Sequence, residues 1–320
     1  MLDSMKKILI TTANGMFGRA VVTELLKKDV TLRLMVRDRN KCAIHDPKAE
    51  IVTADLDHPE TLDAVMTGVD SVFLSSPMDP RLAEREITLV NMAKQSGVKQ
   101  ITRIYGTVGH EGDILESQHL KVRDVIKESG IPQIMVSPGS VLETSLSSMK
   151  ESIKYMRAIY GISGLGKVCM VALKDIAEVT ALLMTSDGHE GKNYELSGPE
   201  AMDLYEVAAR FTRTLGKKII YVNLSEDQFA RMLMKFDKTL TRERLEVEVL
   251  CHLRAWGKGN ASLVTDTIEK LLGRKATPIE GFITENRDLF KKGMIPGFMA
   301  ALMRKMVFLF ALPFMLPFVP

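Results

Sequence analysis

Residues 6–26, KKILITTANGMFGRAVVTELL, constrain the fold more than any other part of this 320-residue chain. A short apolar run at residues 8–10 leads directly into a turn of small residues, and residues with helical spacing follow. A strand, a tight turn and a helix in this order are typical of the first unit of an open α/β sheet. We therefore expect a parallel sheet to be built around this strand.

The turn after this strand, TTANGMFG, has the spacing of a glycine-rich dinucleotide-binding turn, with Thr12 where the first glycine usually stands. Gly15 would let the backbone approach a pyrophosphate, and Gly18 would let the helix pack closely on the strand. The unpaired N–H groups at the helix N-terminus would bind the anion. The alternative is an ordinary tight turn between a strand and a helix. The expected cofactor contacts in this turn are Thr12, Asn14, Gly15, Met16, Phe17 and Gly18.

Composition narrows the class of protein. A hydrophobic content of 46% in 320 residues is enough for one large or two unequal globular domains. The formal net charge of +3 gives no indication of a nucleic-acid-binding surface. The three cysteines stand far apart and the histidines lack metal-ligand spacing, so neither a disulfide framework nor a metal site is expected. The first strand leaves no room for a signal peptide, and we expect a cytoplasmic protein.

Further apolar runs continue the alternation of strands and helices. A helix is expected to open at Pro59, with Leu62, Val65 and Met66 on its buried face. Two longer helices are expected at residues 82–96 and 118–129, each closed by a glycine. Six strands alternating with helices predict a doubly wound parallel sheet of Rossmann type. The strands after the first are expected at residues 30–36, 50–54, 71–74, 100–105 and 134–136.

Beyond residue 150 the alternation loosens. Residue pairs typical of helix caps predict helices at 176–186, 204–215, 226–236 and 267–272, and short strands are expected at 168–171, 194–196 and 219–222. The charged stretch 239–254 is interpreted as an exposed helix with a buried stripe, or as a partner surface. We assign residues 1–155 to a dinucleotide-binding domain, to which 167–197 return, 156–290 to a smaller mixed lobe, and 291–320 to an apolar tail with basic flanks.

Short motifs spread along the chain resemble the NmrA-like branch of the atypical short-chain dehydrogenases, from about residue 5 to residue 290. That branch includes NADPH-dependent quinone reductases and redox-sensing regulators. The resemblance implies a Rossmann fold that binds a nicotinamide dinucleotide. Two departures are Thr12, in place of a glycine that some regulator-like members also lack, and Ser137, where many relatives have arginine. Besides the first turn, the motifs are VRD at 36–38, ADLD at 54–57, GVD at 68–70, SGVK at 96–99, SGIP at 129–132, KDIAE at 174–178, YELSGP at 194–199 and LGR at 272–274.

Arg37, at the end of the second expected strand, determines the expected cofactor. Sites that prefer NAD usually have an acidic residue there, which binds the ribose 2′-hydroxyl. A guanidinium binds a 2′-phosphate through two parallel charge-assisted hydrogen bonds. Lys41 or Arg39 would add positive charge from the same loop, and Asp38 is interpreted as a turn cap rather than a ribose ligand. The expected cofactor is therefore NADP(H).

Other cofactor contacts are expected where the strands end. Ligands of open α/β sheets bind in the crevice at the carboxyl ends of the strands. The two residues after the third strand would border the adenine in a fold of this kind, and the others would flank the rest of the cofactor. The residues concerned are Asp55, Leu56, Ser75, Ser76, Pro77, Tyr105, Gly106, Thr107, Pro138, Gly139 and Ser140.

The usual catalytic pair of short-chain dehydrogenases is missing, because none of the six tyrosines has a lysine four residues later. The resemblance offers His119, which matches a histidine of many NmrA-like proteins and could donate a proton near neutral pH. Arg123, one helical turn later, would face the same way, and the alternative is a solvated helix face. Hydride transfer to a quinone makes less demand on a positioned acid. An NADPH-dependent oxidoreductase acting on a small apolar quinone-like or carbonyl acceptor is the first hypothesis, and a non-catalytic NADP(H)-sensing regulator that binds a protein partner is the second.

The tail, residues 294–320, is almost wholly apolar apart from Arg304 and Lys305. Its last part, residues 306–320, has no charge, but it contains three prolines and is shorter than the ~20 residues of a membrane-spanning helix. A soluble monomer would not leave such a surface bare. Three alternatives stay open: contact with a membrane interface, with Phe308, Leu309, Phe310 and Phe314 in the acyl boundary, packing in a homodimer, or a lid over the cleft.

Overall fold

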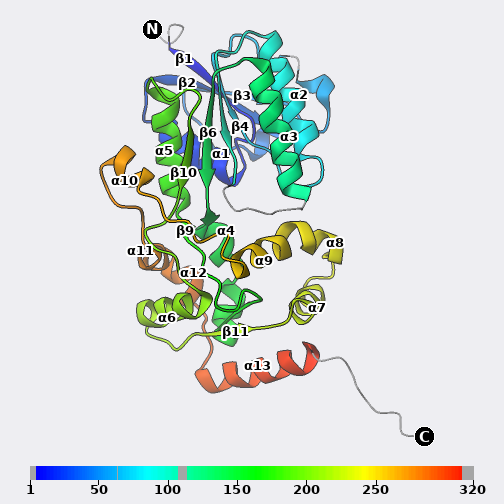
Figure 1. Cartoon of the computed structure of the whole chain (residues 1–320), viewed down its shortest axis with the longest axis vertical. Helices are drawn as coiled ribbons and strands as arrows, with labels where there is room; N and C mark the ends of the chain where they lie inside the picture. Colours follow the sequence, from blue (N-terminus) through cyan, green and yellow to red (C-terminus); the bar gives the residue numbers. More distant parts are fainter. Residues whose placement is uncertain (1–4, 63, 107–113, 312–320) are drawn as a thin grey trace, which may run out of the picture. The chain divides into compact units, whose positions relative to one another are not determined.

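The protein contains a seven-stranded parallel sheet in the order β10-β6-β5-β4-β1-β2-β3, as a computed structural model shows (Figure 1). The structure describes residues 5–62, 64–106 and 114–311. The predicted α/β class with a Rossmann-type sheet is confirmed. The strands of this sheet are β1 (Lys6–Ile10), β2 (Val30–Val36), β3 (Ala49–Thr53), β4 (Ser71–Leu74), β5 (Gln100–Ile104), β6 (Gln133–Pro138) and β10 (Asn193–Leu196).

Helices cover both faces of this sheet, because its central strands are apolar on both sides. On β1, Ile8 and Ile10 face a core that includes Val21 of α1 and Ala181 of α5. Leu9 points to the other face, where a second core includes side chains of α2 and α3. Alternate residues of one strand therefore anchor helices on opposite faces (Figure 1). The helices are α1 (Met16–Leu25), α2 (Leu82–Gln95), α3 (Ile114–Ser129) and α5 (Leu173–Thr185).

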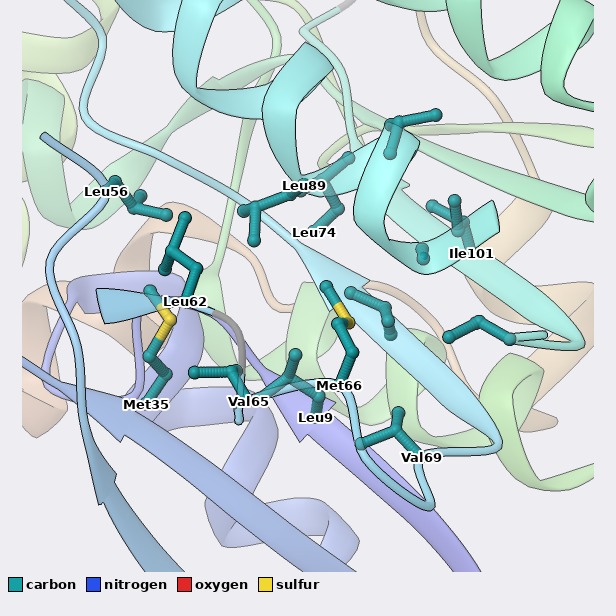
Figure 2. Close-up of a cluster of buried hydrophobic side chains, with 14 of the residues drawn as sticks. Leu9, Met35, Leu56, Leu62, Val65, Met66, Val69, Leu74, Leu89 and Ile101 are labelled. Atoms are coloured by element: carbon teal, nitrogen blue, oxygen red, sulfur yellow. The ribbon is translucent and has the colours of Figure 1, made fainter. Parts of the chain in front are cut away.

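The prediction of a helix that begins at Pro59 is wrong. Among the described residues of this segment, the helical structure is limited to a 3-10 turn, η3 (Pro59–Thr61). Leu62, Val65 and Met66 are nevertheless buried in the core that faces α2 and α3 (Figure 2). The guanidinium of Arg33 on β2 donates hydrogen bonds to the carbonyl oxygens of Val65 (2.9 Å) and Thr67 (2.7 Å). These carbonyls therefore need no helical N–H partner, and irregular backbone can place the apolar side chains in the core.

By its internal contacts the chain divides into two compact units, of which the first is Met1–Gly139, Val171–Ser197 and Thr265–Ala276. Strand β10 returns to the first unit by pairing in parallel with β6, residue 193 opposite 135 through 196 opposite 138. The helix α10 (Thr267–Leu272), which we grouped with the smaller lobe, also belongs to the first unit, where Arg274 after it forms an ion pair of 2.9 Å with Asp175. The first segment of this unit ends at Gly139, before the sequence-based boundary at 155.

The second unit is mainly helical, and its short strands β8 and β11 pair in parallel. Strand β8 follows a π-helical turn, η4, and was not predicted. Asp203 and Ser225 form the predicted capping boxes with Glu206 and Gln228. The charged stretch 239–254 is helical from Arg242 onward, with a π-helical segment η5 in its middle. Elements in or bordering this unit are β7 (Ser140–Val141), α4 (Leu142–Ser147), η4 (Ser152–Met156), β8 (Ala158–Gly161), β9 (Met170–Val171), α6 (Leu204–Leu215), β11 (Ile220–Asn223), α7 (Glu226–Phe236), α8 (Arg242–Leu245), η5 (Glu246–Leu250), α9 (Cys251–Gly257), α11 (Ile279–Glu285), α12 (Arg287–Lys291) and α13 (Gly297–Ala311).

Two other predicted caps are absent. Asp175 lies inside α5, which begins at Leu173. The Asp266 carboxylate accepts no capping hydrogen bond from a backbone N–H of α10 and instead pairs with Lys270 (2.8 Å). Within the described ranges, no helix combines the length and the apolar character needed to cross a membrane.

Candidate functional site

The turn after β1 is shaped by a close approach at Gly18. A Cβ atom added there would lie 2.0 Å from the carbonyl oxygen of Thr12 and 2.7 Å from its carbonyl carbon. At Gly15, the residue before α1, an added Cβ would lie 3.1 Å from the same oxygen. Only glycine fits at residue 18, so the sequence-based interpretation of Gly18 as a close-packing residue agrees with this geometry.

The N-terminus of α1 carries the features of an anion site. No side chain caps the helix, and its first turn contains no acidic residue. The first N–H groups of a helix have no intrahelical acceptor, and the helix dipole favours negative charge there. Asn14, Met16 and Phe17 lie in or beside this first turn, where we predicted them to meet a pyrophosphate.

Two hydroxyl groups join the turn after β1 to the end of β4. The Thr12 Oγ1 atom lies 2.6 Å from Ser75 Oγ. Thr11 Oγ1 also accepts a hydrogen bond from the Ser75 N–H (3.0 Å) and donates one to the Ser75 carbonyl (2.7 Å). Two predicted cofactor residues, Thr12 and Ser75, are thus brought together. A glycine at residue 12 could not make the first of these bonds.

Arg37 lies at the end of β2, next to the turn after β1. The Ala13 N–H donates to the Met35 carbonyl (3.2 Å), which holds the two segments together. Arg37 is exposed, and within the described part of the chain its guanidinium has no hydrogen bond or ion pair. This cation is therefore available to a ligand at the carboxyl end of β2.

The loop after Arg37 is arranged by Asp38. Its carboxylate accepts a hydrogen bond from the Asn40 N–H (3.0 Å), which is the turn-cap role that we favoured. Lys41 lies 3.7 Å from the same carboxylate and remains largely exposed. Arg39 donates to the Ile51 carbonyl of β3. Of the three cations in this stretch, Arg37 alone is without such a contact among the described residues.

The loop after β3 is held by a cluster of ion pairs that sequence reasoning missed. Asp55 accepts a hydrogen bond from the Asp57 N–H (3.0 Å), and Leu56 is buried. Asp57 accepts a hydrogen bond from Arg85 of α2 (2.6 Å), which lowers the pKa of the Asp57 carboxyl. Arg85 also bonds Asp79 (2.8 Å). The predicted adenine-bordering residues Asp55 and Leu56 therefore stand on a loop tied to α2.

A buried polar network lies at the ends of β4 and β5. Arg103 of β5 and Glu86 of α2 form an ion pair of 2.6 Å, with side chains 0% and 2% exposed. Ser76 Oγ donates to the other Glu86 carboxylate oxygen (2.9 Å). Arg103 Nη2 lies 2.9 Å from His119 Nδ1 on α3. Ser76 and His119 were predicted from the sequence, but Glu86 and Arg103 were not. The sequence signal for Arg103 is a single charged residue in β5, a strand otherwise without charge.

The hydrogen bond from Arg103 determines which ring nitrogen of His119 carries the hydrogen. A guanidinium has only donors, so Nδ1 must accept, and the ring is neutral with its hydrogen on Nε2. The Tyr105 ring meets the imidazole edge-on, at 5.2 Å between centroids, and burial raises the pKa of Tyr105. Arg123 instead bonds its neighbour Asp124 (3.0 Å). His119 therefore belongs to the Arg103 network rather than to a pair with Arg123.

The last residues at the carboxyl ends of the strands are those that follow β5 and β6. The Tyr105 N–H donates to the Val136 carbonyl (2.8 Å), and the Gly139 N–H donates to the Leu196 carbonyl of β10 (2.9 Å). Gly106 is exposed after β5, Pro77 follows Ser76 at the end of β4, and Pro138 ends β6. The Ser140 hydroxyl lies 2.8 Å from the indole nitrogen of Trp256. Thr107 lies outside the described residues, and the part of the chain that is described shows no cluster of three or more possible metal ligands.

Several known proteins align with most of this chain. The chain is 28% identical to an NAD(P)H azoreductase of Xenophilus azovorans over 288 residues, 88% of this chain and 99% of that protein. It is 30% identical to quinone oxidoreductase 2 of Escherichia coli over 233 residues, 71% of this chain and 80% of that protein. The structure of an NADPH-dependent quinone oxidoreductase of Escherichia coli, complexed with NADPH, matches with a TM-score of 0.79 at 27% identity, covering 87% of this chain and 99% of that one.

The family assignment rests on a family model as well as on these relatives. The model of the NmrA-like family matches residues 4–283, which contain the turn after β1, the Arg37 loop and the Arg103 network. The motifs that suggested this resemblance lie within the matched range. The chain belongs to the NmrA-like family.

Proposed function

We propose that this protein is an NADPH-dependent oxidoreductase that transfers hydride to a small apolar acceptor, quinone-like or carbonyl-bearing. The proposal rests mainly on one observation: the Gly18 turn after β1 lies next to the exposed Arg37 at the carboxyl end of β2. Together they offer helix N–H groups for a pyrophosphate and a guanidinium for a 2′-phosphate. The azoreductase and the quinone oxidoreductases among its relatives support the same general chemistry.

In this proposal each end of the cofactor has its own residues. The pyrophosphate lies on the turn from Thr12 to Gly18, and the 2′-phosphate on Arg37 with Lys41 nearby. Asp55 and Leu56 border the adenine. The nicotinamide end meets the residues after β4, β5 and β6. These last residues are Ser75, Ser76, Pro77, Tyr105, Gly106, Pro138 and Gly139.

The bound cofactor supplies the hydride, and the protein orients the acceptor and the proton. A neutral His119 donates a hydrogen bond through Nε2 to the acceptor oxygen, since Arg103 occupies Nδ1. The oxygen is protonated by water, because a neutral imidazole is a poor acid. His119 therefore positions and polarises the acceptor rather than acting as a strong general acid.

Replacing Arg37 by alanine tests the cofactor assignment. We expect NADPH to bind about 10- to 100-fold more weakly, because charge-assisted hydrogen bonds to the 2′-phosphate are lost. NADH lacks that phosphate, so its affinity should change by no more than about twofold. Fluorescence titration of both nucleotides measures the difference, with Arg213→Ala on α6 as an exposed arginine control. Equal losses for both nucleotides would overturn the role of Arg37.

The tautomer of the His119 imidazole can be measured directly by NMR. In histidine labelled with ¹⁵N, we expect the His119 Nδ1 signal at an unprotonated position and Nε2 at a protonated one, near neutral pH. Replacing His119 by phenylalanine should lower kcat about tenfold, the effect of one neutral hydrogen bond, and leave NADPH affinity unchanged. The opposite tautomer, or an unaltered kcat, would remove His119 from this role while leaving the cofactor site intact.

A further inference from the structure

The last described helix, α13, presents large apolar side chains to solvent in its part up to Met306. Ala300 is fully buried, and Arg304 donates to the Met156 carbonyl at the end of η4. A surface helix normally buries its large apolar residues and exposes its polar ones. On α13 the opposite holds: small side chains face the rest of the second unit. Five large apolar side chains are 40–78% exposed: Phe298, Met299, Leu302, Met303 and Met306.

This orientation is fixed by the chain just before the helix. Arg157, in the left-handed region at φ 47°, donates from Nε (3.0 Å) and Nη2 (2.7 Å) to the Ile295 carbonyl. The Ile295 N–H donates to the Lys154 carbonyl (3.2 Å). At Gly297 an added Cβ would lie 3.0 Å from Arg157 Nη1, so the first turn of α13 sits tightly against this guanidinium. These bonds hold the helix with its large residues outward.

Neighbouring elements extend the same surface. The helix α13 contacts η4 and α7, and each of them carries an exposed aromatic ring, Tyr155 and Phe236. In Figure 1, α7 and β11 lie on one side of α13 only. We call the five apolar residues of α13 together with Tyr155 and Phe236 the α13 surface. Three of its seven side chains are aromatic, and Phe and Leu are typical of the apolar face of a helix that lies in a membrane interface.

The charges on α13 and on the chain beside it are all positive. After Asp288 the sequence contains no acidic residue, but it contains Lys291, Lys292, Arg304 and Lys305. Residues 307–320, which follow the last residue of this surface, are uncharged. A two-fold contact between copies would bring equal patches of positive charge together, whereas an anionic lipid surface neutralises them. Charge complementarity therefore favours a membrane over a second copy of the chain.

We infer that the α13 surface binds the interface of an anionic membrane, with α13 parallel to the bilayer plane. Phe298, Leu302 and Met306 enter the acyl boundary, and Lys305 remains at the headgroups. No described helix is able to span a bilayer, which agrees with binding at the surface rather than insertion. This inference is independent of the proposed reductase activity, because it concerns only the second unit.

Vesicle co-sedimentation of the purified full chain tests the inference. We expect binding to phosphatidylcholine vesicles that contain phosphatidylglycerol and weaker binding to phosphatidylcholine alone. The triple variant F298S/L302S/M306S should partition at least about 100-fold more weakly, because three large apolar side chains are lost. Lys305→Glu should weaken binding to the anionic vesicles only. The control is Leu165→Ser, which replaces a leucine that is 75% exposed elsewhere in the second unit. This variant should bind the vesicles like the wild type.

The outcomes distinguish a membrane from a second copy of the chain as the binding partner of the α13 surface. All the replaced side chains are exposed, so thermal unfolding of the variants should match that of the wild type. Equal binding of the wild type and the triple variant would overturn the inference, as would a wild type that binds neither vesicle. A dimer in sedimentation equilibrium that the triple variant converts to a monomer, without vesicle binding, would assign the surface to a second copy.

Discussion

Replacing Gly18 by alanine is expected to abolish measurable NADPH binding and to lower the free energy of unfolding by about 3 kcal/mol or more. The new Cβ would lie 2.0 Å from the Thr12 carbonyl oxygen. That oxygen is backbone and cannot rotate away, so either the helix α1 or the turn must move. Movement of the turn would also break the 2.6 Å contact between Thr12 and Ser75. Urea denaturation measures the loss of stability, and nucleotide fluorescence measures the loss of binding.

Two other glycines provide a graded comparison. At Gly15 the new Cβ would lie 3.1 Å from the same oxygen, so alanine there should have an intermediate effect. At Gly188 nothing lies within 4 Å, and only the strain of φ +82° remains. Gly188→Ala should destabilise by about 1 kcal/mol and leave NADPH binding unchanged. If Gly18→Ala bound NADPH like the wild type, the close packing of this turn would not be what the cofactor site requires.

Replacing Glu86 by alanine is expected to destabilise the protein by about 3–5 kcal/mol. It would leave the Arg103 guanidinium buried without its carboxylate, since the two side chains are 2% and 0% exposed. Desolvation makes an unpaired buried charge far more costly than a missing surface pair. The Arg103–His119 contact of 2.9 Å would also lose its support. Chemical denaturation followed by circular dichroism measures the difference.

A double replacement distinguishes charge burial from general packing damage. Glu86→Leu combined with Arg103→Met removes both charges and keeps similar volumes, so it should recover most of the stability lost by Glu86→Ala. The exposed pair Arg244–Glu248 is the matched control, and Glu248→Ala should have a far smaller effect. A double variant as unstable as the single one would show that the pair stabilises the protein by more than mutual neutralisation.

The parts of the fold that the sequence predicts well depend on local patterns. Strands β1, β2 and β4 have buried residues on both faces and therefore appear in the sequence as short, mainly apolar segments. The capping boxes at Asp203 and Ser225 need only residues three positions apart. Such signals lie entirely within a few residues of the chain, and the structure confirms them.

The errors arise where distant residues decide the local structure. Leu62, Val65 and Met66 have helical spacing, but Arg33 on another strand satisfies the carbonyls of that segment. Asp175 resembles a cap, yet it is buried inside α5 and pairs with Arg274, far along the chain. No local pattern contains these partners.

The same distinction holds for the candidate site. The Gly18 turn is a contiguous motif, so the sequence alone identified it. Arg103 and Glu86 are 17 residues apart on a strand and a helix, and a single arginine in a strand does not reveal its partner. The role of His119 as an acceptor from Arg103 follows only from the folded arrangement.

The most direct test of the proposed function is one cuvette in which NADPH absorbance and fluorescence are followed with the purified protein, before and after a panel of quinones and aromatic aldehydes is added. We predict a change in fluorescence on binding, followed by loss of absorbance with at least one acceptor. Binding without consumption of NADPH by any acceptor would contradict the reductase and favour a regulator that senses NADP(H). Absence of binding would contradict the cofactor assignment on which the proposal rests.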